Sequence, residues 1–303
     1  MKRSSFAAIL AWFVALPLLL LGQNAEPVMA LKVRNPIAIS GTPGTGYFVL
    51  TDDGAVYRYV DKPSGLTFAG KFGLPTPGEA YDLTTTRAEN RDSVIVTSWL
   101  NAQAIGWIHM ISPEGKVLHS WVTRKLVSGL ATDERNHIIY FSAYFSSAES
   151  NELYRIKLPG GQPEFVCTIR GVKRAGAIAV DSRTNTVYVS DPVGGGLIQI
   201  DILSKRSTPL STALRLPSAL YLQEETRTIY IADALQKAVY AMNLAGAARN
   251  LTIVSRSSKF RSPTGLAPGP RGTLLVADSQ ASAVFLLRTG PQPADILGNI
   301  KKR

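Results

Sequence analysis

The stretch IAVDSRTNTVYVSD, from Ile178 to Asp191, decides the fold of this 303-residue chain. It consists of an alternating apolar run, a polar turn and a second alternating run that ends in Asp. Alternation with period two, in segments rich in Val, Ile and Tyr that are broken by Asn, Asp and Gly, is typical of short antiparallel strands. The stretch therefore predicts a β-hairpin, and the same phrase recurs along the chain.

The phrase recurs six times at regular spacing. The units open at Ile37, Tyr81, Leu130, Ile178, Leu220 and Leu266, at intervals of 42 to 49 residues. Each unit adds a third apolar run, and most add a fourth. Six repeats of four short strands predict an all-β fold, a single six-bladed β-propeller with four-stranded antiparallel blades. The alternative, a pair of packed sheets, does not suit such regular repeats.

The repeats resemble those of known propellers. GLATDERNHIIYFS, IAVDSRTNTVYVSD and ALYLQEETRTIYIAD look like the repeats of NHL, YWTD and gluconolactonase-like propellers of the TolB-like superfamily. The resemblance covers nearly the whole chain after residue 30. It implies the fold and leaves the function open, because families that share this strand pattern do different things.

The first thirty residues differ from the rest. A basic start is followed by an apolar run over residues 6–21, and Val28-Met29-Ala30 resembles a signal-peptidase site. We therefore expect a secretory signal peptide at 1–30, a propeller at 31–303, and export to the periplasm or cell exterior. An uncleaved anchor is the alternative, although the run is shorter than the roughly 20 residues that cross a bilayer. No second apolar segment of that length follows.

The net charge of the chain limits the kinds of partner that it can bind. Without residues 1–30, which hold two basic residues and one acidic residue, 31 basic and 21 acidic residues remain, a net charge of +10. Export makes nucleic acid an unsuitable partner, so we expect an anionic polymer, a cell-wall component, a lipid surface or an acidic protein. The alternative is that the charge only maintains solubility. Cys167 is the single cysteine, so no internal disulfide forms, and its apolar neighbours predict a buried side chain. We expect the protein to be a monomer.

The Asp that closes the second strand of a unit admits two interpretations. If the four strands of a blade are called a to d from the axis outward, the start of a and the end of b lie on one face, here called the top face. Four units close strand b with Asp: Asp52, Asp191, Asp233 and Asp278. An acid repeated once per blade suits a structural acceptor for turn N–H groups better than an active site, which is built once.

The gluconolactonase-like resemblance implies one divalent metal at the top of the channel, held by Glu, Asn and Asp. Ser218 stands where the Asn would be and Thr264 where the Asp would be, and the first unit has no Glu near Asn35. His109, His119 and His137 are not spaced as a metal site, and His109 and His119 alternate with apolar neighbours like sheet residues. We therefore expect no metal, no cofactor and no catalytic residue, with a divergent cation site as the alternative.

The top face has a basic and aromatic character. The connections from strand d to the next strand a carry Arg or Lys in five of six cases, including Arg124, Arg174, Arg215 and Arg261. The two units without a closing Asp carry Trp99, Tyr144 and Phe145 there instead. These seven residues are the predicted binding site for an anionic or carbohydrate-like ligand. The alternatives are that the arginines form ion pairs with the Asp residues at the ends of the b strands, and that the aromatic residues pack in the core between blades.

The sequence thus favours a non-catalytic binding module for a ligand or a protein. The alternatives are a gluconolactonase-like hydrolase or lyase and a sensor that docks another protein. Two segments are candidates for the last outer strand that closes the ring: Ala294 to Leu297, or Leu31 to Val33.

Overall fold

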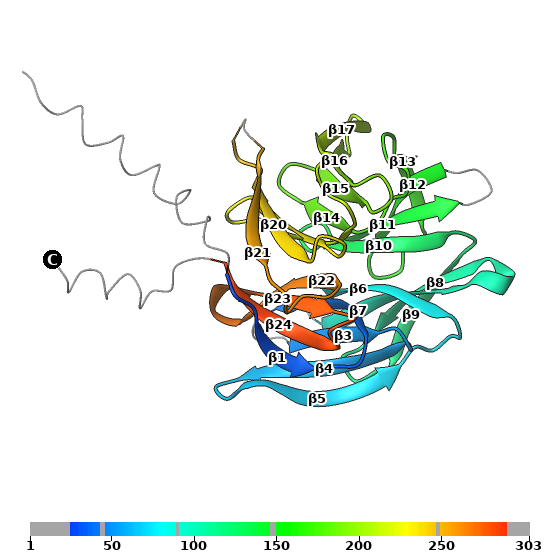
Figure 1. Ribbon diagram of the computed structural model, residues 1–303. Helices are drawn as coiled ribbons and strands as arrows, with labels where there is room; N and C mark the ends of the chain where they lie inside the picture. Colours follow the sequence, from blue (N-terminus) through cyan, green and yellow to red (C-terminus); the bar gives the residue numbers. More distant parts are fainter. Residues whose placement is uncertain (1–24, 43–45, 89–90, 146–149, 247–248, 290–303) are drawn as a thin grey trace, which may run out of the picture.

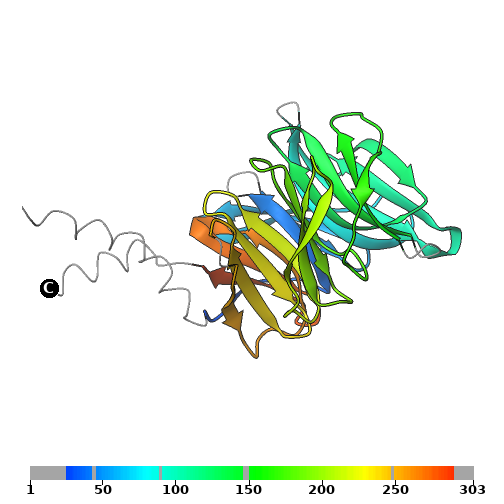
Figure 2. The same cartoon turned by 90° about the horizontal axis from the view of Figure 1, so that it is seen from above.

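The computed structural model describes residues 25–42, 46–88, 91–145, 150–246 and 249–289. Its strands form six four-stranded antiparallel sheets, which are arranged as blades around a central axis (Figures 1 and 2). The prediction of a six-bladed β-propeller is confirmed. None of the described residues belongs to a helix long and apolar enough to cross a membrane.

The blades follow one another in chain order, and their strands run outward from the axis. Blades 1 and 2 are β2 (Pro36–Thr42), β3 (Gly46–Thr51), β4 (Ala55–Lys62), β5 (Gly65–Gly73) and β6 (Glu79–Ala88), β7 (Arg91–Leu100), β8 (Ile105–Ile111), β9 (Val117–Thr123). Blades 3 and 4 are β10 (Leu126–Asp133), β11 (Ile138–Phe145), β12 (Ser150–Lys157), β13 (Glu164–Thr168) and β14 (Ile178–Asp181), β15 (Thr186–Asp191), β16 (Gly196–Asp201), β17 (Arg206–Ser211). Blades 5 and 6 are β18 (Pro217–Gln223), β19 (Thr228–Asp233), β20 (Ala238–Asn243), β21 (Leu251–Arg256) and β22 (Pro263–Pro268), β23 (Thr273–Asp278), β24 (Ala283–Arg288), β1 (Val28–Lys32).

The core lies between the blades, which is why the strands are apolar on both sides. In β15, every residue after Thr186 is buried. One apolar cluster joins Tyr140 and Leu153 of blade 3 to Ile178 and Val189 of blade 4. Fully burying a side chain of this size contributes about 1.5–3 kcal/mol. Because each blade covers its neighbour, the ring is stable only when it is closed.

The N-terminal segment closes the ring. β1 pairs with β24 as the outermost strand of blade 6, with Val28 opposite Leu286. Just before it, Ala25 donates its N–H to the carbonyl of Val254 in blade 5 at 2.9 Å. Of the two closures considered, the one by the N-terminal segment is observed, while residues 294–297 lie outside the described residues. The predicted cleavage point after Ala30 falls inside β1, and cleavage there remains a prediction.

The pairing registers define equivalent positions in the six blades. Ile39 and Leu83 correspond to Leu130, Ile178, Leu220 and Leu266, because each pairs at the same step of its a–b ladder. The first two units therefore open two residues later than the sequence pattern predicts. A shift of two residues keeps every side chain on the same side of a strand, so the alternation alone does not reveal it.

Candidate functional site

The closing Asp residues hold the top face together through the backbone. The carboxylate of Asp233 is fully buried and accepts the N–H of Gln236 in the b–c turn at 2.9 Å. It also accepts the N–H groups of Arg215 and Leu216, in the connection that enters the blade, at 2.7 and 3.2 Å. The same three kinds of bond recur at Asp191 and Asp278. The structural interpretation of these three residues is confirmed.

Blade 1 departs from this pattern. β3 ends at Thr51, which pairs with Pro36, and this is the position that Asp233 occupies opposite Pro217. Asp52 is exposed and accepts one hydrogen bond, from Nδ2 of Asn35 at 2.9 Å. The prediction that Asp52 closes the strand is therefore wrong by one residue.

The Arg and Lys residues of the connections from strand d to the next strand a are here called the basic rim. The closing Asp residues determine, through their hydrogen bonds, whether these basic side chains can form ion pairs. They accept the backbone N–H groups of the rim residues, so they do not pair with the guanidinium groups. Arg124, Arg215 and Arg261 are exposed, and no ion pair is found for their side chains within the described ranges. Lys125 differs, because its ammonium group contacts Glu152. Most of the predicted rim is thus positive charge without an acidic neighbour.

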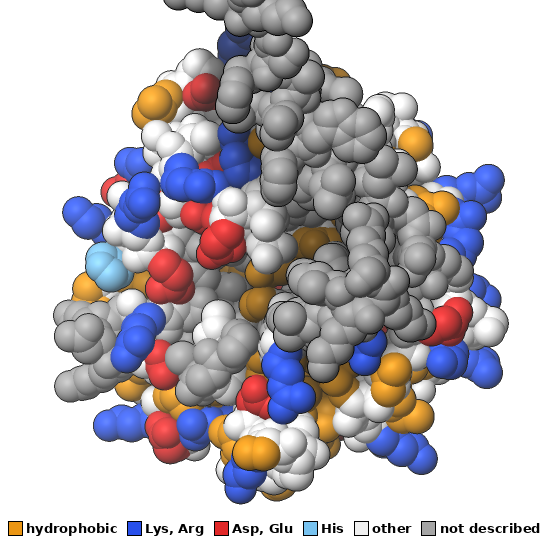
Figure 3. Space-filling view, turned by 90° about the vertical axis from the view of Figure 1, so that its left-hand side faces the viewer, with side chains coloured by type: hydrophobic (Ala, Val, Ile, Leu, Met, Phe, Trp, Pro, Cys, Tyr) orange, Lys and Arg blue, Asp and Glu red, His pale blue; other side chains and the backbone are white. Residues whose placement is uncertain are grey.

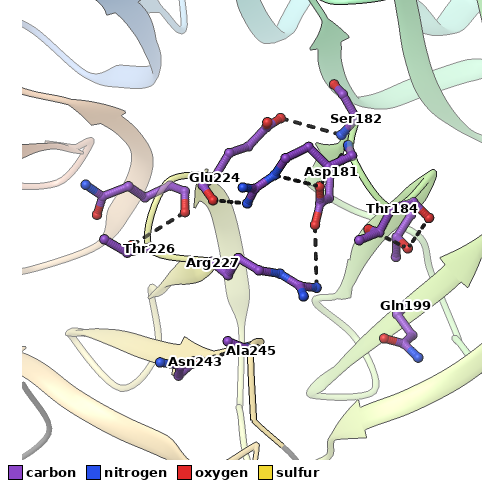
Figure 4. A network of polar contacts seen from close by, with 12 residues as sticks. Asp181, Ser182, Thr184, Gln199, Glu224, Thr226, Arg227, Asn243 and Ala245 are labelled. Atoms are coloured by element: carbon purple, nitrogen blue, oxygen red, sulfur yellow. Dashed lines mark hydrogen bonds and ion pairs between the residues drawn. The ribbon is translucent and has the colours of Figure 1, made fainter. Parts of the chain in front are cut away.

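At the opposite, bottom face, some of the charged side chains pair with one another. Between blades 4 and 5, the buried carboxylate of Asp181 lies 3.7 Å from a guanidinium nitrogen of Arg227 and 4.0 Å from Nε of Arg183 (Figure 4). The N–H of Ser182 donates to Glu224 at 3.5 Å. These contacts join neighbouring blades. Within the part of the chain that the structure describes, Arg183 and Arg227 therefore have an acidic partner, unlike Arg124, Arg215 and Arg261 of the top face.

The predicted aromatic residues lie at the top of blades 2 and 3. The Arg174 guanidinium stands 5.6 Å from the centre of the Tyr144 ring, a cation–π distance. Trp99, half-buried near the end of β7, pairs with Glu79 at the start of β6. Phe145 is the last residue of β11, and its side chain lies outside the described residues. The structure thus joins Tyr144 and Arg174 directly and places Trp99 on the adjacent blade.

The axial channel, which the sequence pattern did not single out, adjoins this group. It has a volume of about 700 Å³ and is lined by all six innermost strands, with Tyr81 and Asp82 near its top end. The Tyr81 hydroxyl donates to Glu79 at 3.3 Å. Arg174 is close enough to act on Tyr81 electrostatically, although burial dominates and raises the pKa of that phenol. Tyr81 therefore links the top-face group to the channel.

The channel wall is polar on one side and apolar on the other. Blades 1 to 3 contribute a ladder of hydroxyl groups, in which Ser40 bonds Thr85 at 3.1 Å and Thr84 bonds Thr132 at 3.0 Å. Blades 4 to 6 contribute mainly apolar side chains, including Val180, Leu222 and Ala267. The wall thus offers hydrogen bonds to one side of a ligand and apolar contact to the other.

Two hydroxyl groups on the polar side have no partner among the described residues. Thr86 and Ser93 are almost fully buried, are opposite each other on β6 and β7, and their oxygens make no hydrogen bond there. Both line the channel toward the bottom face, as do Glu134 and Glu224. On this face, acidic side chains stand beside an apolar hollow near the centre (Figure 3).

Asp82 is an ionisable group near the top end of the channel. Its two carboxylate oxygens accept the N–H of Leu83 in its own strand and of Leu130 in blade 3, both at 2.8 Å. Burial raises its pKa to about 7, against the lowering effect of these two bonds. The side chain is nevertheless partly accessible from the channel. It therefore exchanges a proton near neutral pH at a position that a ligand can reach.

Ser218 and Thr264 hold the positions that the gluconolactonase-like resemblance assigns to metal ligands. The Ser218 hydroxyl donates to the carbonyl of Pro263 at 2.6 Å, and Thr264 donates to that of Pro36 at 2.9 Å. Both hydroxyl groups thus bond the next blade. Within the described ranges, no three His, Cys, Asp or Glu residues are grouped to hold an ion.

His109 is a sheet residue, as expected. Its ring is buried and lies 2.9 Å from Thr76 and 2.8 Å from Ser120. Burial lowers its pKa to about 4, so it is neutral near pH 7. Cys167 is buried as well.

The comparisons with known proteins concern the fold. No family model and no curated protein matches the chain. Nidogen, solved in complex with laminin, superposes with a TM-score of 0.64 at 14% identity over 78% of this chain and 87% of its own. A putative oxidoreductase (glucose dehydrogenase) from Thermus thermophilus gives 0.62 at 13% over 87% and 100%.

An auxiliary nutrient binding protein from Bacteroides thetaiotaomicron gives a TM-score of 0.61 at 11% identity, over 84% of this chain and 69% of its own. At such identities the likeness concerns fold and not activity. The chain therefore shares the six-bladed propeller architecture of the NHL, YWTD and gluconolactonase-like proteins.

Proposed function

We propose that this chain is an exported, non-catalytic binding protein that takes an anionic or carbohydrate-like ligand at the top mouth of its axial channel. Export rests on the apolar leader within residues 1–30. The binding role rests on the top-face geometry. Among proteins of this fold, the Bacteroides neighbour carries the name of a nutrient binding protein, and nidogen was solved bound to laminin.

The observation that carries the proposal is the placement of Arg174. Its guanidinium lies over the Tyr144 ring and makes no ion pair within the described ranges, while its backbone N–H is held by Asp191. An anchored cation beside aromatic rings suits a sugar ring or aromatic ring that carries a carboxylate. The adjoining channel, at about 700 Å³, falls within the size range of small-molecule sites.

Calorimetric titration with uronic-acid oligosaccharides and muramyl peptides tests the proposal. We expect Arg174→Ser to weaken binding by about tenfold or more, the loss typical of a charge-assisted hydrogen bond. Trp99→Ala should weaken binding by about two- to tenfold, because it removes a ring contact. Arg271→Ser, on an exposed bottom-face turn, is the matched control and should bind like the parent. Equal affinities for the parent and the Arg174 variant, or no binding by the parent to any probe, would contradict the proposed site.

One observation favours a second candidate, a hydrolase or lyase with a divergent site. Asp82 has a pKa of about 7 inside the channel, which suits a general acid or base. If this candidate holds, Asp82→Asn abolishes turnover of a lactone or glycan probe while ligand affinity is kept. Elemental analysis separates the metal-dependent form of this candidate, because one tightly bound divalent ion per chain would support it.

A further inference from the structure

The top face over blades 4 and 5 carries exposed apolar side chains on its loop tips. Val193 is 58% exposed, Leu235 is 60% exposed, and Leu216 is 39% exposed. Val193 and Leu235 occupy the same position in successive b–c turns, two residues after the closing Asp. Large apolar side chains that recur at exposed loop tips of one face indicate an interaction surface.

The three residues belong to one continuous surface. The turn that holds Val193 bonds the connection between the two blades, where the N–H of Leu214 donates to the carbonyl of Gly195 at 3.1 Å. The same connection bonds the next turn, where the N–H of Ala234 donates to the carbonyl of Leu216 at 3.0 Å. The loop tips are therefore held side by side by backbone bonds.

The charge around these tips has a single sign. Lys173, Arg215, Lys237 and Arg261 are exposed and make no ion pair within the described ranges. The b–c turns of blades 4, 5 and 6 contain one acidic residue each: Asp191, Asp233 and Asp278. All three are buried and accept backbone N–H groups. Nearby, Glu26 is paired with Lys259 at 3.6 Å. A surface that approaches this face therefore meets exposed Val and Leu side chains that are flanked by Lys and Arg residues without ion pairs in the described part of the chain.

We propose that this patch, formed by Val193, Leu216 and Leu235 with Lys173, Arg215, Lys237 and Arg261, docks the propeller onto an anionic lipid surface. Short apolar side chains on rigid turns enter the interfacial layer, while Lys and Arg at the same height contact the headgroups. Charge complementarity selects this occupant, because a neutral surface leaves four cations without counter-charges. Arg215 and Arg261 also belong to the predicted ligand-binding residues, and Lys173 adjoins Arg174. Val193, Leu216, Leu235 and Lys237 belong to the patch alone, so a probe at position 235 reports docking separately from ligand binding.

Vesicle binding with a site-specific probe tests this docking surface. Leu235→Cys is labelled with an environment-sensitive fluorophore, and labelling is selective because Cys167 is buried. Leu203→Cys is the matched control, since Leu203 is 78% exposed in the c–d turn of blade 4, at the bottom face. Both variants keep the same N-terminal form, checked by mass spectrometry, so any insertion of the leader affects them equally.

We expect the probe at position 235 to shift to shorter wavelength with vesicles of phosphatidylcholine and phosphatidylglycerol, but not with phosphatidylcholine alone. The probe at position 203 should remain in water. The double variant Arg215→Ser/Lys237→Ser should weaken partitioning by about fivefold per residue, whereas Lys205→Ser/Arg271→Ser, with the same charge change at the bottom face, should not. A position-235 probe that ignores anionic vesicles, or a position-203 probe that responds equally, overturns the proposal. Capture of an acidic protein without vesicle binding overturns it as well.

Discussion

Asp82→Asn probes the polar wall of the channel through the pH dependence of stability. The Asp82 carboxylate joins blades 2 and 3 by accepting the N–H of Leu130. Burial raises its pKa from the ordinary 3.8 to about 7. The folded state therefore holds the proton more tightly than the unfolded chain does. The amide of Asn keeps the shape of this side chain but removes its titration.

The sign and size of the effect follow from linkage. A carboxyl group with a raised pKa in the folded state contributes stability that is complete below about pH 4 and is lost as the pH rises to about 7. One pKa unit corresponds to about 1.4 kcal/mol, so the whole loss is about 4 kcal/mol. Titration of Asp82 alone therefore lowers the stability of the parent by this amount between pH 4 and pH 8, and the variant lacks this contribution.

His109 titrates with the opposite sign in part of this window. Burial lowers its pKa from 6.5 to about 4, so its contribution is complete above pH 6.5 and is lost as the pH falls toward 4. Between these values the two slopes oppose each other, and the curve of the parent alone is nearly flat. The difference between the Asp82 variant and the parent isolates Asp82, because His109 is present in both.

The assay is urea denaturation followed by circular dichroism at intervals from pH 4 to pH 8. We expect the free energy of unfolding of the Asp82→Asn variant to rise relative to that of the parent by about 4 kcal/mol across this range. The amide can accept only one of the two N–H groups, which adds a constant offset of about 1–3 kcal/mol and leaves the slope unchanged. Parallel curves for the two proteins would refute the reasoning.

Three further predictions concern the ring and its core. Asp233→Ala should lower the free energy of unfolding by about 2–4 kcal/mol, because several N–H groups lose their buried acceptor, whereas Asp52→Ala should cost less than about 1 kcal/mol; urea denaturation compares them. Deleting residues 1–30 should lower the melting temperature more than deleting 1–24, because only the longer deletion removes part of β1. Cys167 is buried with a raised pKa, so a thiol reagent should label it only in denaturant, as mass spectrometry can follow.

The fold was predictable because it is repeated. Six copies of one phrase determine the number of blades, and the alternation determines which residues face a neighbouring blade. The alternation does not determine where a weak copy begins. In blade 1, the phrase around Asp52 places an acid one residue beyond the position that Thr51 takes. The physical reason is that a turn accepts an acid at either position, while only one of them is buried.

The candidate site was predictable only in part. Spacing brought Arg174 and Tyr144 to one face, and the structure pairs them. Spacing predicted that the closing Asp residues accept N–H groups of the turn, but not that they also accept the backbone N–H groups of Arg174, Arg215 and Arg261, whose guanidinium groups are then left without an acidic partner among the described residues. Spacing also did not show the channel. Its wall is formed by the innermost strands of all six blades, and the sequence of a single strand gives no sign of it. Both findings depend on contacts between blades.

Asp82 shows how the repeat itself points to the site once the registers are known. The equivalent position in the other five blades is Ala38, Gly129, Ala177, Ala219 or Gly265, so it holds only small residues. At Gly265 the space is narrow, since an added Cβ would lie 2.9 Å from the backbone nitrogen of Ile39 in the next blade. In blade 2 the carboxylate of Asp82 bonds the corresponding nitrogen, that of Leu130.

A residue that breaks a steric rule kept by five of six blades is a candidate for function. Blade 2 also lacks the closing Asp, since Ser98 occupies that position, and it contributes Trp99 and Tyr81 to the top face. A ring that needed only to close would have no use for Asp82, because the other five blades hold only Ala or Gly at its position. The differences gather in the blade that borders both Tyr144 and the channel, and this is why we place the ligand there.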